Sequence, residues 1–352
     1  MSKHEEITNR RYPIPPPPRR KVDPLLMLKD NTKITTIAGP MVRYSKLPFR
    51  QLVRQYHCDI VYTPMILARE FVRNGHARIS DFSTCQLDTP LIVQVGVNNV
   101  SDLLKFVEMV APFVDAVGIN CGCPIKEQIR EGIGCALIYN EELLIEMVKE
   151  VKLKWKDQIR LETKIRIHDD WDRSLKLCVG LCEVGVDWIT IHGRTRTTRS
   201  SQPVNLDAIK YIIEGIRKAG FEDIPIVANG DCFTMKDFKK IAEYTKCQGV
   251  MAVRGLLNNP ALFSGYDICP WSCIENFWYW VIEFGGIPYQ LIQHHFYCML
   301  ENMNLKKKLL NEMMEIKSLV QLMDWFDDNF ELKRYNNIGF GQSIEIPYRI
   351  KD

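Results

Sequence analysis

With 352 residues, of which 46% are hydrophobic and 25% charged, the chain can form one large domain and a smaller one, and this composition excludes a generally disordered protein. Its formal net charge of +3 is too small to identify a nucleic-acid binder, although a small average can conceal a basic face. No apolar run approaches the ~20 residues of a membrane span and the polar first residues do not form a signal peptide, so we expect a soluble intracellular protein, cytoplasmic or alternatively nuclear.

Residues 1–30 are predicted to form a flexible basic arm. Pro15 to Pro18 are followed by Arg19, Arg20 and Lys21. This composition favours the extended polyproline conformation and has little apolar surface to bury. We therefore expect the arm to lie outside the folded domains.

Residues 31–265 show short runs rich in Val and Ile, each followed by a longer stretch with helical spacing of apolar residues. Helices are expected at Asn140–Trp155 and Ser174–Val184, for example. Eight parallel strands with crossover helices in this length favour an α/β fold of the (β/α)8 TIM barrel type over an open, doubly wound sheet. The predicted strands are Ile34–Ala38, Asp59–Tyr62, Leu91–Val95, Asp115–Ile119, Leu161–Ile167, Asp187–Ile191, Pro225–Ala228 and Gly249–Val253.

Residues 266–340 are predicted to form a smaller all-helical domain, and residues 341–352 a tail. Trp, Phe and Leu recur there at helical spacing, and Lys306, Lys307, Lys308 and Lys317 add positive charge. The aromatic run from Phe277 to Trp280 could stack nucleic-acid bases, but the core of a small helical bundle is the favoured interpretation.

The twelve cysteines are expected to be free thiols, because an intracellular compartment is reducing. No CxxC pair of the zinc-ribbon kind occurs, and Cys178 and Cys182 lie one helical turn apart, as on a packed helix face. We therefore predict no metal site.

Polar groups and tight turns follow almost every predicted strand, which is where an α/β barrel builds its active site. The segments are Ala38 to Met41, Thr63 to Met65, Gln94, Asn120 to Pro124, Lys164 with Arg166, His192 to Thr195, Asn229 to Asp231, and Arg254 with Gly255.

The last two segments predict a phosphate site, because barrels of this kind commonly hold phosphate after strands seven and eight. Gly230 and Gly255 permit close approach of the backbone, and Arg254 supplies charge-assisted hydrogen bonds. Each motif alone is more often an ordinary turn. Their shared position favours a phosphorylated cofactor.

Lys164 lies in the apolar segment TKIRI, where an unpaired ammonium is costly to bury. A barrel-lining lysine suits the negative charge that a reduced flavin carries near N1 and O2 of its pyrimidine ring. The alternative is a lysine paired with Glu162 or another carboxylate. Residues 162, 164 and 166 share one strand face, so Arg166 is expected beside Lys164.

Cys123 is fixed between Gly122 and Pro124, just beyond the fourth strand. A thiol with an ordinary pKa of about 8.5 is mostly protonated at neutral pH, which suits a general acid. No activating His is adjacent in sequence, so proton donation is the favoured role. The alternative, a packed free cysteine, is the default for Cys58, Cys85 or Cys178.

The ordered set AGPMVRYSKLPFR, TPMI, VQVG, NCGCP, TKIRI, HGRTR, VANGD and VRGLLNNPALF resembles the flavin-dependent tRNA-dihydrouridine synthases over residues 34–265. The NCGCP and PMVRYSKLPFR forms look most like the branch acting at positions 20a and 20b of the tRNA D-loop. The resemblance implies Cys123 as the proton donor. It also implies an FMN site made of Pro40, Met41, Val42, Gln94, Asn120, Lys164, Arg166, His192, Asn229, Gly230, Asp231, Val253, Arg254 and Gly255.

The resemblance further implies that NADPH, or NADH, reduces the FMN, that hydride then passes from flavin N5 to uracil C6, and that Cys123 protonates C5. The uridine must be unstacked to reach the flavin. The helical domain and the basic residues Arg43, Lys46 and Arg50 are candidates for the surface that holds the tRNA, although surface lysines alone are usually just solvated. A monomer is the expected oligomeric state.

Two other functions remain compatible with these residues. One is an FMN-dependent reductase of a free pyrimidine or small enone, against which the helical domain argues. The other is a catalytically inactive RNA-binding barrel, against which Cys123, Lys164 and His192 argue.

Overall fold

The computed structural model describes residues 21–349, and its strands form one closed parallel barrel. The strands pair in the order β1-β2-β4-β5-β6-β7-β8-β9, and β9 pairs with β1 again. All eight predicted strands are present, and a ninth, β3, extends the pairing of β4. Their bounds are Thr35–Ala38 (β1), Ile60–Tyr62 (β2), Ile66–Leu67 (β3), Leu91–Gly96 (β4), Ala116–Cys121 (β5), Arg160–Arg166 (β6), Trp188–His192 (β7), Ile226–Asn229 (β8) and Gly249–Ala252 (β9).

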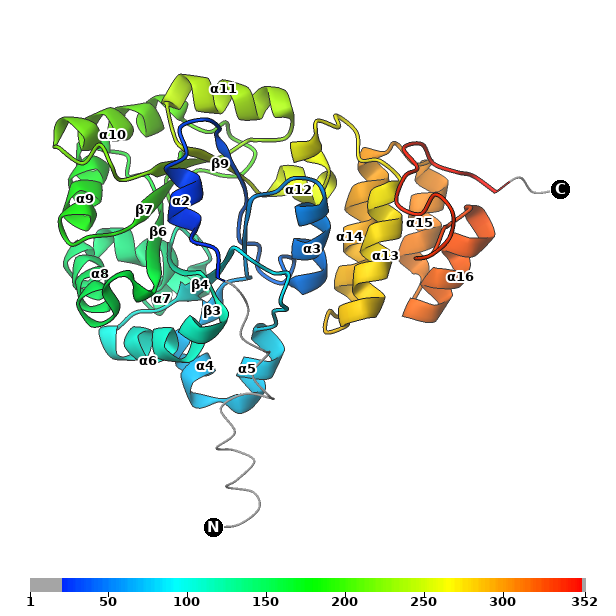
Figure 1. The fold of residues 1–352 in the computed structure, drawn as a ribbon, viewed down its shortest axis with the longest axis horizontal. Coiled ribbons are helices and arrows are strands. Elements are labelled where there is room, and N and C mark those ends of the chain that lie inside the picture. The colour runs from blue at the N-terminus through cyan, green and yellow to red at the C-terminus, as the bar shows by residue number, and fades with distance from the viewer. Residues whose placement is uncertain (1–20, 350–352) are drawn as a thin grey trace, which may run out of the picture.

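Helices cover the outside of the barrel, as the sequence predicted (Figure 1). Their apolar faces and the outward side chains of the strands share one core, which includes Cys178 and Cys182 on α9. The helices are α3 (Leu47–Gln55), α4 (Ala68–Arg73), α5 (Gly75–Asp81), α6 (Val100–Val110), α7 (Lys126–Arg130), α8 (Glu141–Trp155), α9 (Trp171–Glu183), α10 (Leu206–Lys218), α11 (Met235–Thr245) and α12 (Arg254–Asn258).

A second, smaller core fills the barrel interior, where Ile37, Ile60, Tyr62 and Trp188 pack together. Strand β6 contributes to both layers, because its side chains alternate. Leu161 and Ile165 join the outer core, whereas residues 162, 164 and 166 face inward. The inner core leaves the carboxyl ends of the strands to polar side chains.

The amino ends of the strands are closed by helix α2 (Pro24–Leu28), which Asp23 caps by accepting a hydrogen bond from the Leu25 amide. Leu28 is only 1% exposed and belongs to the inner core. Residues 1–20 of the predicted arm lie outside the described residues. The folded chain nevertheless begins before residue 30, because Leu28 has a buried place under the barrel.

Four helices follow the barrel: α13 (Ser272–Phe284), α14 (Tyr289–Asn302), α15 (Lys307–Glu315) and α16 (Leu319–Asn329). Helix α13 packs on α3 of the barrel (Figure 1), where the Tyr56 hydroxyl lies 2.7 Å from the Ser272 hydroxyl. Phe277 and Trp278 are buried, which confirms a core role for this half of the aromatic run. The described part of the predicted tail packs against the start of α13, where the Trp271 amide donates a hydrogen bond to the Ile344 carbonyl.

Helix α11 follows the β8 loop and begins with a reciprocal cap. The Thr234 hydroxyl accepts from the Asp237 amide at 3.1 Å, and the Asp237 carboxylate accepts from the Thr234 amide at 3.0 Å. Thr234→Ala is expected to lower the free energy of unfolding by about 1 kcal/mol, as loss of an N-cap does. Urea unfolding measures this. Thr234→Ser keeps the hydroxyl and should change little; an equal loss in both variants would contradict the cap.

No helix within residues 21–349 combines the length and apolar character needed to cross a membrane.

Candidate functional site

A cavity of about 270 Å³ opens at the carboxyl ends of the barrel strands. Every predicted site residue lines it except Met41, which is buried in the outer core, where its amide donates to the Ser45 hydroxyl. Met41 therefore packs in the core behind the loop that follows β1 and does not face the cavity. The lining also includes Gly122, Arg194, Ser200, Cys232, Phe233 and Met251, which the sequence prediction did not assign to the site.

Asn120 organises the loop that carries Cys123. Its side-chain oxygen accepts from the amides of Gly122 at 3.0 Å and of Cys123 at 2.9 Å. Its side-chain nitrogen donates to Gln94 Oε1 at 2.7 Å. This leaves Gln94 Nε2 buried and without a hydrogen-bond partner among the described residues. Gln94 therefore presents an unsatisfied donor at the cavity wall.

Cys123 is half-buried at the cavity, whereas Cys121 is fully buried in the outer core. The segment at Gly134 clamps the loop: the Cys135 amide donates to the Cys123 carbonyl at 3.0 Å, and a Cβ at Gly134 would lie 2.9 Å from Cys123 Cβ. Burial raises the pKa of the Cys123 thiol, against the lowering effects of the Ile125 amide and of Arg166 and Lys164. The thiol is therefore protonated at neutral pH.

Lys164 lies at the cavity floor, where its ammonium donates to Asn229 Oδ1 at 2.8 Å. Asn229 is oriented for this contact because its Nδ2 donates to the Met251 carbonyl at 3.0 Å. Burial lowers the pKa of Lys164, and the charge of Glu162 opposes that lowering. Glu162 faces the barrel interior and forms no ion pair with Lys164 within 4.0 Å, so a direct salt bridge does not satisfy the lysine.

The upper wall is rich in positive charge. The Arg166 guanidinium donates to the Thr195 carbonyl at 2.8 Å, while its Nε is buried without a partner among residues 21–349. Burial and the charges of Lys164, Arg166, Arg194 and Arg254 lower the pKa of His192 well below its usual value. His192 is therefore a neutral imidazole, able to donate one hydrogen bond and accept another.

Asp231 binds two arginines at the predicted phosphate site. Its carboxylate is 2.6 Å from Arg194 and 2.7 Å from Arg254, so the three groups together carry one positive charge. A Cβ at Gly255 would overlap the Cys232 carbonyl, which shows how closely the two loops approach. Arg194 lies in the predicted strand-end segment His192 to Thr195 but was not among the residues assigned to the cofactor site.

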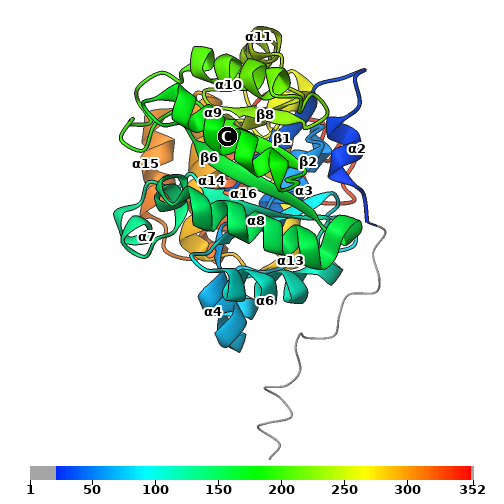
Figure 2. The same ribbon diagram turned by 90° about the vertical axis from the view of Figure 1, so that its left-hand side faces the viewer.

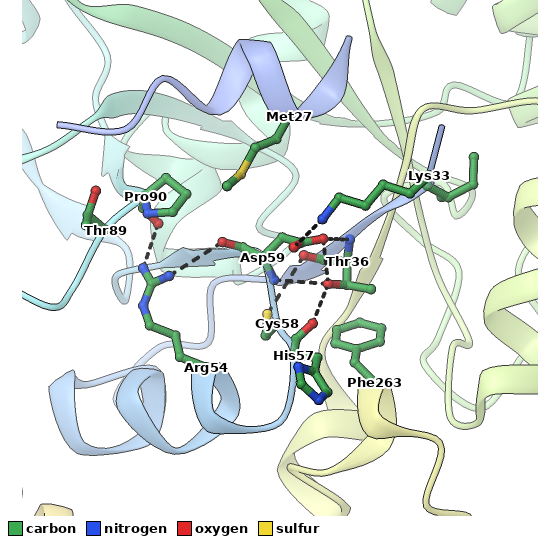
Figure 3. A pocket seen from close by; sticks show the side chains of 11 residues that line it. Met27, Lys33, Thr36, Arg54, His57, Cys58, Asp59, Thr89, Pro90 and Phe263 are labelled. Carbon is green, nitrogen blue, oxygen red and sulfur yellow. Dashed lines mark hydrogen bonds and ion pairs between the residues drawn. The ribbon is translucent and has the colours of Figure 1, made fainter. Parts of the chain in front are cut away.

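A larger hollow of about 560 Å³ lies at the amino ends of the strands. There Lys33 pairs with Asp59 at 2.8 Å, and Arg54 donates to the Pro90 carbonyl at 2.7 Å (Figure 3). These charged groups bind each other or the backbone, although Arg54 Nε is buried without a partner among the described residues. Size alone therefore does not identify the site. No three metal-ligating side chains gather within the described part of the chain.

Of the three basic residues suggested as RNA contacts, Arg50, which lies on α3, is misassigned. It is 2% exposed and donates to Asp88, with one contact of 2.7 Å. The Arg50 side chain is therefore part of the buried interior, where it forms an ion pair with Asp88. Arg43 is exposed, and Lys46 is half-buried with its ammonium on the Ser80 carbonyl at 2.7 Å.

The sequence of this chain is similar to a known protein family and to several named proteins. The sequence model for dihydrouridine synthases matches residues 36–347. A Saccharomyces cerevisiae protein named tRNA-dihydrouridine(20a/20b) synthase (NAD(P)+) is 66% identical over 94% of this chain and 90% of its own. The Schizosaccharomyces pombe protein of that name is 45% identical over 89% and 93%. A Homo sapiens protein with that name and the suffix "-like" is 41% identical over 88% and 95%. These matches confirm the resemblance drawn from the motifs.

Proposed function

Because the chain belongs to the dihydrouridine synthase family, we propose that it reduces the C5–C6 bond of uridines 20a and 20b in transfer RNA. FMN is the proposed cofactor, and NADPH, or NADH, the hydride donor. One observation supports this proposal most. The protonated thiol of Cys123 lines the same cavity as two buried hydrogen-bond donors that lack partners among the described residues, Gln94 Nε2 and Arg166 Nε. Because the proposed substrate is tRNA, we propose that the protein acts in the cytoplasm or the nucleus.

The residues present fit FMN. Gln94 Nε2 and Arg166 Nε are buried donors without partners among the described residues, and Lys164 adds a charged donor at the floor. The pyrimidine edge of a flavin offers matching acceptors at N1, O2 and O4. The net positive charge of Arg194, Arg254 and Asp231, with the loops at Gly230 and Gly255, suits the phosphate.

Bound FMN supplies the hydride that reaches C6 of the uracil. The protein supplies the proton: Cys123 donates it to C5, and Asn120 holds the loop so that the thiol stays at the cavity. Neutral His192 can hydrogen-bond the uracil or the cofactor without adding a charge.

We further propose that residues 266–340 hold the tRNA, with the lysines at the start of α15. Figure 2 shows α15 on the same side of the molecule as α7, which follows the Cys123 loop, and α2 on the opposite side. Lys306, Lys307 and Lys308 are exposed. One RNA molecule that contacts both the uridine site and the lysines must extend along the long axis of the protein, because Figure 1 shows α7 and α15 toward opposite ends of that axis.

Replacing Lys306, Lys307 and Lys308 together by alanine is expected to weaken tRNA binding. The slope of log affinity against log salt should become shallower by about 1 for each phosphate that the variant no longer neutralises. Filter binding over a salt series measures this. Alanine at Lys105, Lys149 and Lys176, which are exposed on the outer helices, is the matched control. An equal change in both triple variants would contradict an RNA-binding role for α15.

The whole proposal is tested by mapping dihydrouridine in tRNA from cells that lack the protein. Loss of the base at 20a and 20b is expected, with return on re-expression. Turnover of free uridine at the rate of tRNA would instead indicate the small-molecule reductase. A purified protein without flavin colour would indicate the inactive RNA-binding barrel.

A further inference from the structure

Glu162 is a buried carboxylate directly beneath the proposed flavin site. It lies two residues before Lys164 on β6, and its exposed fraction is 0%. Neither carboxylate oxygen has a hydrogen-bond partner among residues 21–349. The hydroxyls of Tyr62 and Thr190 are likewise without partners, although both lie close enough to lower the pKa of Glu162.

The neighbouring strand provides the space for this carboxylate. Gly118 on β5 is the register partner of Glu162, and a Cβ at Gly118 would overlap Glu162 Oε2. The carboxylate therefore fills a place that any larger residue at position 118 would occupy. A charge in such a place is stable only with an opposite charge nearby.

Lys164 is the cation that supplies this charge. The other titratable groups that act on Glu162 or respond to it are Tyr62 on β2 and Cys121 on β5, and burial raises the pKa of each well above its usual value, so both are neutral. Strand β7 contributes the uncharged Trp188 and Thr190. Burial raises the pKa of Glu162, and the charge of Lys164 opposes this effect. Glu162 and Lys164 therefore lie two residues apart on one face of β6, beneath the cavity and at its floor, although no ion pair within 4.0 Å joins them.

We propose that Glu162 is the counter-charge of Lys164 and takes up a proton when negative charge forms above that lysine. The inference rests on the proposed function, since it places the pyrimidine ring of FMN over Lys164. Hydride from NADPH would bring two electrons and one proton to bound FMN and leave it with one negative charge. A second proton, from solvent, converts the Glu162 carboxylate to the acid. Glu162 is thus a positioning residue, which acts on the cofactor through Lys164.

The physical reason is charge balance in a medium of low polarity. When the Glu162 carboxylate and the Lys164 ammonium are both ionised, their charges cancel. A new negative charge on the far side of Lys164 competes with Glu162 for this lysine, inside the barrel where charges are poorly screened. Protonation of Glu162 leaves Lys164, with Arg166 in the cavity wall, to balance the new charge.

Infrared difference spectra of the flavin-loaded full-length protein, reduced minus oxidised, test the inference without measuring turnover. A positive band of a protonated carboxyl is expected on reduction in the wild type. It should vanish in Glu162→Gln and persist in Glu275→Gln, a buried carboxyl in α13 away from the cavity. The band should also disappear at acid pH, because Glu162 is then protonated before reduction.

Three outcomes separate the possibilities. Absence of the band in the wild type, or its persistence in Glu162→Gln, overturns the proton uptake while leaving the flavoprotein assignment intact. A protein that binds no flavin overturns both. If Glu162→Gln does not fold, Glu162→Asp decides: it keeps a carboxyl but shortens the side chain by one methylene, so the band should remain and shift. An unshifted band in Glu162→Asp then assigns it to another residue and overturns the inference.

Discussion

Replacing Cys123 by alanine is expected to slow uridine reduction by about 10²- to 10⁴-fold, the usual cost of losing a general acid. The fold should be unaffected, because the thiol is half-buried at the cavity rather than packed in the core. Reduction of the flavin by NADPH should also be unaffected, since that half-reaction needs no proton from the enzyme. Single-turnover oxidation of the reduced enzyme by unmodified tRNA measures the affected step alone.

Cys121→Ala is the matched control, since Cys121 is the last residue of β5 and Cys123 lies two residues later in the loop that follows. The Cys121 side chain lies in the outer core, fully buried, so its loss should affect stability more than the rate of tRNA reduction. If Cys121→Ala were slow and Cys123→Ala fast, the proton donor would have to be reassigned.

Lys164→Ala should weaken FMN binding by roughly 10- to 100-fold, the range that corresponds to one hydrogen bond from a charged group. The substitution also leaves Glu162 buried without its counter-charge, which adds to the cost. Fluorescence titration of FMN into the stripped protein measures the affinity, and NADPH oxidation by the loaded protein measures the first half-reaction.

Lys152→Ala provides the comparison for Lys164. Lys152 is also partly buried, but it pairs with Asp187 at 2.8 Å at the amino end of β7, away from the cavity. The Lys152→Ala substitution should lower the stability of the protein without changing its affinity for FMN. Normal flavin content and normal NADPH oxidation in Lys164→Ala would contradict the role assigned to this lysine.

The sequence by itself determined the barrel and most of its cavity. Buried parallel strands need continuous apolar runs, and each run predicted here became a strand within two residues of its expected bounds. The carboxyl ends of parallel strands meet at one face, so residues as distant as Gln94 and Arg254 could be assigned to one site without knowing any contact.

Only the tertiary structure decided how charges pair across the chain. Arg50 and Asp88 are far apart in sequence, yet they form a buried ion pair, so a residue that reads as a surface cation became part of the core. Asp231 likewise joins Arg194 to Arg254, and Leu28 fills the floor of the barrel. Local patterns report which face of a strand or helix is apolar. They carry no information on which distant side chain occupies the facing space, because that depends on how the elements pack.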